Sequence, residues 1–219
     1  MLFNFIITNL NFIAFIVWII FSFIVLARFI HPNLVKNISY SILLAVAFFL
    51  HIFYGAFETF AQYFVWATGS AEMQIFLSTP LPPEAPLPAM LQWARIYFDH
   101  PFGYFSYYVL GRFWINILIL FLVAGFLYVI LKVWNFYRGR FIPKGPEIML
   151  ISFLISGWPG LLVLLPVGLI FWVVFFIYSY IHGRYRVLIE PAFLFATPVA
   201  LIFSNYILSS LHIAQLLSV

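Results

Sequence analysis

Residues 5–27 form an apolar run in which only Thr8, Asn9, Asn11 and Ser22 are polar. A helix needs about 20 predominantly apolar residues to cross the roughly 30 Å hydrocarbon core of a bilayer. Similar runs recur along the chain, and only 7% of its 219 residues are charged, against about a quarter in soluble domains. The sequence therefore predicts an all-α fold, namely a polytopic integral membrane helical bundle.

About five transmembrane spans are expected, all within a single membrane domain that covers residues 1–219. Their approximate ranges are 5–27, 38–66, 113–134, 161–180 and 191–211. The first run lacks the basic start and the small-residue cleavage site of a signal peptide, so it is interpreted as a retained span. A count of six spans stays open, because the helical stretch 146–180 is too long for one upright span and too short for two.

The sequence Gly157-Trp158-Pro159-Gly160 is expected to break that long stretch. Before the break we expect a short helix that lies on the membrane surface or is half-buried. After it, residues 161–180 are expected to form a full span.

Positive charge predicts how the chain is oriented. The densest basic cluster follows the third span and comprises Lys132, Arg138, Arg140 and Lys144. Because loops rich in Lys and Arg stay in the cytoplasm, this cluster predicts a cytoplasmic loop. Alternation then places the N-terminus outside, the C-terminus inside and the basic turn at 182–186 outside, against the usual trend. The net charge of +4 is interpreted as topological, and no nucleic-acid partner is expected.

Residues 67–112 are expected to form an external loop with interfacial helices. Prolines at positions 80, 82, 83, 86 and 88 exclude a regular helix from the first part of this loop. The stretches 89–98 and 102–114 mix aromatic, small and basic residues, which is typical of helices that lie in the membrane interface.

Several kinds of chemistry lack the residues they need. With zero cysteines there is no disulfide and no thiolate site. The one aspartate and the five glutamates are not paired at helical spacing, so no catalytic residue is assigned. No metal site is predicted either, because the histidines lack ligand spacing; they are His31, His51, His100, His182 and His212. No cofactor is expected, although a bound lipid stays open.

Two ionisable residues fall inside the second span. His51 and Glu58 are seven residues apart, so they lie on one face of a helix about two turns apart. Ionisable groups inside a membrane cost several kcal/mol unless they are paired or hydrated. Either each makes a hydrogen bond that packs helices together, or the two form an intramembrane polar pair that acts as a relay. Haem ligation by His51 and His212 is disfavoured, because His51 lies mid-span and His212 at a helix end.

Two aromatic and basic segments carry a family resemblance. They are Ala-Arg-Ile-Tyr-Phe-Asp-His-Pro-Phe-Gly-Tyr-Phe-Ser-Tyr-Tyr-Val-Leu-Gly-Arg-Phe-Trp at 94–114 and His-Gly-Arg-Tyr-Arg-Val-Leu-Ile-Glu-Pro at 182–191. In order and separation they resemble elements in the C-terminal membrane region of GT-C glycosyltransferases of the mannosyltransferase type. The similarity covers roughly residues 90–210. The acidic catalytic loop of that family is missing here, and Val187 stands where the family has a proline.

The resemblance implies a lipid-handling role rather than catalysis. It implies that Arg184, Tyr185, Arg186 and Arg112 bind a polyprenyl phosphate through charge-assisted hydrogen bonds.

Three functions follow as hypotheses. The first is an accessory or structural subunit of a larger membrane assembly, without independent catalysis, whose partners are membrane lipids and other integral membrane subunits. The second is the lipid-binding module of a split or degenerate GT-C glycosyltransferase. The third is a transporter or channel subunit that uses His51 and Glu58. The high Phe content suggests an AT-rich genome, so the expected location is a bacterial or organellar inner membrane.

Overall fold

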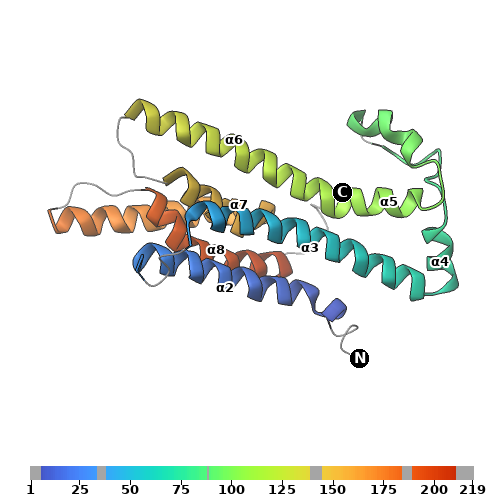
Figure 1. The fold of residues 1–219 in the computed structure, drawn as a ribbon, viewed down its shortest axis with the longest axis horizontal. Coiled ribbons are helices and arrows are strands. Elements are labelled where there is room, and N and C mark those ends of the chain that lie inside the picture. The colour runs from blue at the N-terminus through green and yellow to red at the C-terminus, as the bar shows by residue number, and fades with distance from the viewer. Residues whose placement is uncertain (1–5, 34–37, 88, 139–144, 184–188, 211–219) are drawn as a thin grey trace. The chain divides into compact units, whose positions relative to one another are not determined.

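The computed structural model describes residues 6–33, 38–87, 89–138, 145–183 and 189–210. Within these ranges the chain is all-helical and no strand is present, which confirms the predicted fold class (Figure 1). The helices are α2 Leu10–Ile30, α3 Tyr40–Thr68, α4 Ala71–Leu77, the 3-10 helix η1 Ala89–Tyr97, α5 Gly103–Val109, the π-helical turn η2 Leu110–Trp114, α6 Ile115–Arg138, α7 Gly145–Ile181 and α8 Ile189–Ser210.

Four segments of the described chain are long and apolar enough to cross a membrane. They are Leu10–Ile30, Tyr40–Thr68, Gly103–Trp134 and Gly160–Ile181. These segments match four of the predicted spans and indicate a membrane protein. The fifth predicted span corresponds to α8, whose apolar part Ile189–Ser204 is shorter, so that crossing stays a prediction.

The helical segment that contains the third predicted span begins before that span. Residues 102–114 were predicted to lie in the interface, and the span was predicted to begin at 113. In the structure α5, η2 and α6 follow one another without a gap, so the apolar helical segment begins at Gly103. The reason is local: no proline occurs between Gly103 and Arg138, and η2 accommodates Gly111 as a π-turn.

The chain divides into two compact units. Unit 1 contains Met1–His51 and Ile119–Val219, and unit 2 contains Ile52–Leu118. The helices α3 and α6 each contribute residues to both units.

The core of unit 1 is the first half of α7. Every residue from 148 to 156 is at most 7% exposed, including Ser152 and Ser156. Both serine hydroxyls donate to carbonyls of the same helix, so their burial leaves no donor unpaired. The prediction placed this short helix on the membrane surface or half-buried. In the structure it is surrounded by other helices of unit 1, because its apolar residues cover its whole circumference rather than one face.

The predicted break in α7 is confirmed at Gly157. This residue has φ 68° and ψ 175°, a backbone conformation that side chains strongly disfavour, and it separates Gly145–Gly157 from Gly160–Ile181. The sequence located the break correctly. It did not predict how sharply the chain turns there.

Contacts with α8 show that the two halves of α7 fold back on each other. Phe193 of α8 packs edge to face on Phe153 of the first half, with ring centroids 6.3 Å apart. The same Phe193 ring would lie 2.8 Å from a methyl group placed on Gly168 of the second half. In a straight helix residues 153 and 168 would be about 22 Å apart, too far for one ring to reach both. Figure 1 accordingly shows both ends of α7 on the same side of unit 1.

Two sets of contacts hold unit 2 together: aromatic packing around Trp66, and hydrogen bonds from Arg95 to the proline-rich segment. Trp66 of α3 packs on Phe105 and Tyr108, with centroid distances of 5.1 and 5.3 Å. Arg95 of η1 donates to the carbonyls of Pro82, Pro83 and Ala85, at 3.3, 2.8 and 2.6 Å. The predicted helix at 89–98 is therefore present as η1, and it fixes the path of the proline-rich segment.

Candidate functional site

His51 lies where four helices of unit 1 meet. Its imidazole is 8% exposed, and its Nε2 lies 2.6 Å from the carbonyl oxygen of Leu154 in α7. Its ring stacks at a tilt on Trp18 of α2, with centroids 4.6 Å apart, and lies edge to face with Phe121 of α6 at 6.0 Å. His51 therefore joins α3 to three other helices.

The carbonyl of Leu154 is available because α7 breaks three residues later. The last four carbonyls of any helix lack an intrahelical donor, and Leu154 is within four residues of Gly157. A carbonyl only accepts hydrogen bonds, so Nε2 of His51 carries the proton and donates it. His51 thus caps the buried C-terminal end of the first half of α7. This is the helix-packing hydrogen bond that was one of the two interpretations of the residue.

Glu58 has a different partner. The hydroxyl of Tyr54, one turn earlier in α3, donates to Oε1 of Glu58 at 2.6 Å, and Glu58 is 8% exposed. Tyr54 and Glu58 are four residues apart, so they are neighbours on the helix surface. The sequence left open whether His51 and Glu58 each make a packing hydrogen bond or together form a relay; in the structure each has its own hydrogen-bond partner.

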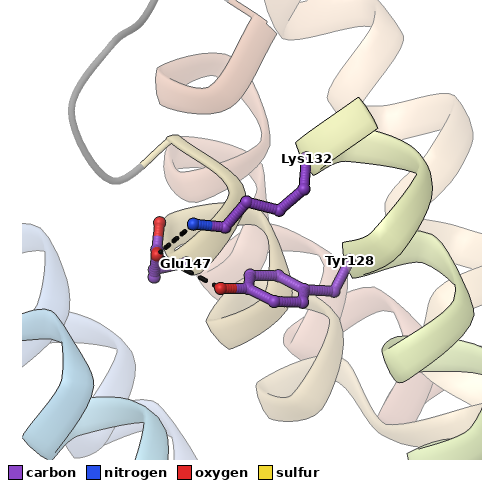
Figure 2. Close-up of polar contacts among 3 residues, drawn as sticks. All are labelled: Tyr128, Lys132 and Glu147. Carbon is purple, nitrogen blue, oxygen red and sulfur yellow. Dashed lines mark hydrogen bonds and ion pairs between the residues drawn. The ribbon is translucent and has the colours of Figure 1, made fainter. Parts of the chain in front are cut away.

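A second polar cluster joins the end of α6 to the start of α7 (Figure 2). Lys132 Nζ and the Tyr128 hydroxyl both donate to Oε1 of Glu147, at 3.1 and 3.3 Å. The ammonium of Lys132 also lies 5.3 Å from the Tyr128 ring centroid. The second carboxylate oxygen, Oε2, is buried and has no hydrogen-bond partner among the described residues. One ion pair and one hydrogen bond from the Tyr128 hydroxyl therefore hold α6 against the start of α7.

The surroundings of Glu147 favour its ionised form. Partial burial alone would raise the pKa of this carboxyl, but its own backbone amide and the Lys132 ammonium outweigh that effect and lower the pKa below its usual value. Sequence reasoning used Lys132 only for orientation and missed the cluster. The spacing of Tyr128 and Lys132 signals a shared helix face, but their pairing with Glu147 depends on tertiary packing.

Glu190 of α8 is a further buried polar residue near the start of α7. A methyl group on Gly145 would lie 2.7 Å from Oε1 of Glu190, so the carboxylate packs directly against this glycine. Glu190 is 8% exposed and lies against the first residue of α7. A negative charge at a helix N-terminus is favourable, because the exposed amides carry partial positive charge.

The predicted lipid-phosphate site is described only in part. Arg184, Tyr185 and Arg186 lie outside the described residues. Arg112 is described: its guanidinium donates to the Tyr108 hydroxyl and lies over the rings of Tyr108 and Phe113, 5.5 and 5.9 Å from their centroids. Phosphate binding by these residues stays a prediction.

In the described ranges, no three side chains of the His, Cys, Asp or Glu type are grouped so that they could hold a metal ion. A comparison of the chain with protein-family models, curated proteins and solved structures finds no match.

Proposed function

We propose that this protein is an accessory or structural subunit of a larger assembly in a bacterial or organellar inner membrane. The observation that carries the proposal is the exposure of Gly103–Trp134. This helical segment is among the most apolar in the chain, and only 11% of its most apolar window is buried within the protein. Such a helix covers most of its surface with lipid or with another membrane protein.

Two glycines on this segment favour a protein partner. A methyl group at Gly111 or Gly125 would meet no atom within 4 Å. Gly111 lies in unit 2 and Gly125 in unit 1, so each is a separate small-residue position at which a partner helix could approach. Small residues let the backbones of two membrane helices approach closely, and this contact is a main source of affinity between helices in lipid.

The polar groups described above support a bracing role. His51 caps a helix end, Glu58 accepts from Tyr54, and Lys132 pairs with Glu147. Each of these bonds lies within one unit and is already used to hold helices or turns in place.

Purification in a mild detergent tests the proposal. We expect the unmodified chain to co-purify with other membrane proteins, and a stable monomer without companions would refute the subunit role. In the variants Gly111→Leu and Gly125→Leu we expect partners to be lost, because the added side chains separate the helix backbones. Ile130→Phe is the matched control, since Ile130 is 45% exposed on a different face of the same helix.

A second candidate function is transport or conduction, which the fold of α7 favours. Interrupted helices whose ends lie inside the membrane form the ion and substrate sites of many transporters. Here such an end, at Leu154, is contacted by His51. Proton or ion flux into liposomes tests this function. We expect flux to fall with His51→Ala and with Glu58→Gln, and no flux in the unmodified protein would exclude it.

A further inference from the structure

Several helix ends of unit 1 are held together at one place. The Lys132–Glu147 ion pair joins the end of α6 to the start of α7. Glu190 lies against Gly145, so the start of α8 is there as well. We call this region the basic end of unit 1.

Aromatic contacts add two more helix ends to the basic end. Phe195, in the second turn of α8, packs edge to face on Phe29 of α2 and on Phe175 of α7, with centroid distances of 6.4 and 5.6 Å. Phe29 is next to the last residue of α2, and Phe175 is six residues before the end of α7. Both the beginning and the end of α7 are therefore at the basic end.

The opposite end of unit 1 is marked by the turn of α7. A methyl group on Gly160 would lie 3.1 Å from Cβ of Ser156 and 3.8 Å from the hydroxyl oxygen of Ser204. Ser204 is four turns along α8 from Glu190, so α8 runs away from the basic end toward this turn.

Most of the positively charged residues in the sequence are close to the helix termini that form the basic end. Eight of the ten Lys and Arg residues lie in or beside the three connections that start and finish there. They are Arg28, Lys36, Lys132, Arg138, Arg140, Lys144, Arg184 and Arg186. The other two, Arg95 and Arg112, lie between α3 and α6.

We infer that the basic end of unit 1 faces the anionic headgroups of the cytoplasmic leaflet, and that α7 enters and leaves the membrane on this side. Loops rich in Lys and Arg are retained in the cytoplasm, where anionic lipids attract them. From the cytoplasmic side the chain then crosses the membrane once more through α8, so the end of α8 is on the external side. This assignment differs from the alternation in the sequence analysis, which placed 182–186 outside and the C-terminus inside. There, α7 was counted as a crossing.

Single cysteines test the sidedness, because the chain contains none of its own. The variants are His31→Cys, Glu84→Cys, His182→Cys and Ser210→Cys, each treated with a membrane-impermeant maleimide in intact and in permeabilised bacterial cells. The unmodified chain is the control for background labelling. Labelling in denaturing detergent shows that each cysteine is present and reactive.

We expect His31→Cys and His182→Cys to be labelled only after permeabilisation, and Glu84→Cys and Ser210→Cys to be labelled in intact cells. If α7 crosses the membrane, His182→Cys is labelled with Glu84→Cys, and Ser210→Cys with His31→Cys; this result would overturn the inference. Labelling of His31→Cys and His182→Cys in intact cells, with the other two protected, would overturn the cytoplasmic assignment.

Discussion

The two halves of α7 have similar compositions and opposite surroundings. Gly145–Gly157 and Gly160–Ile181 are both almost entirely apolar. In the first half, residues 148–156 are buried, whereas in the second half large side chains such as Leu162, Ile170 and Ile181 are 69%, 62% and 72% exposed. In a membrane protein, an apolar side chain can face either protein or lipid, because lipid tails are as apolar as leucine. Composition therefore shows that a helix is in the membrane, and packing contacts show where it lies in the fold.

The largest expected effect comes from truncation in the first half. Leu154→Ala should lower the free energy of unfolding by roughly 2–5 kcal/mol, because Leu154 is fully buried and the change leaves a cavity. Leu162→Ala in the second half should change it by less than about 0.5 kcal/mol. Unfolding in mixed micelles titrated with SDS measures both values. Equal losses would show that the two halves are not packed differently.

Removal of the cap on the first half should have the next largest effect. His51→Phe keeps an aromatic ring between Trp18 and Phe121 but leaves the Leu154 carbonyl without a donor. We expect a loss of roughly 1–3 kcal/mol in the same unfolding experiment. His51→Gln can still donate a hydrogen bond and should lose less. If both variants are as stable as the unmodified protein, the hydrogen bond from His51 does not stabilise the folded-back arrangement of α7.

The turn between the halves can be tested through Gly157. Gly157→Ala forces a side chain into a backbone conformation that costs about 1–3 kcal/mol, so the variant should unfold more easily. Gly125→Ala is the control. Gly125 is helical and has open space around it, so alanine there should be neutral or stabilise by up to about 1 kcal/mol.

The smallest effect is expected at the entry to the first half. Lys132 is half exposed, so Glu147→Gln should cost no more than about 1 kcal/mol. The pKa of Glu147 is lowered in the folded protein, so its stabilising contribution is present above the ordinary pKa of a glutamate. It is lost as the pH falls through the lowered value. Unfolding measured across acidic pH should show this loss in the unmodified protein and not in Glu147→Gln.

The sequence predicted the local features of this fold and missed those that depend on tertiary contacts. Long apolar runs predicted four helices that are long and apolar enough to cross a membrane, and Gly157 with Pro159 predicted the break in α7. The Tyr54 and Glu58 bond could have been found from its four-residue spacing. The turn-back of α7 could not be predicted, because a break in a helix does not define the angle between its two parts.

The same distinction applies to the candidate site. The sequence singled out His51 as an ionisable group inside a predicted span. Its partner, the backbone carbonyl of Leu154, has no sequence signature and is 103 residues away. The Glu147 cluster was missed for the same reason, since a single glutamate next to a basic loop does not indicate which cation it meets.

The short first half of α7 also has a consequence for biosynthesis. Gly145–Gly157 is about 20 Å long, so it cannot cross a bilayer by itself. Its packing partner α8 is the last helix of the described chain to leave the ribosome. This segment therefore reaches its final place late in translation. A chain that stops at residue 188 contains every residue of the half-helix and lacks α8, the helix on which its Phe153 packs.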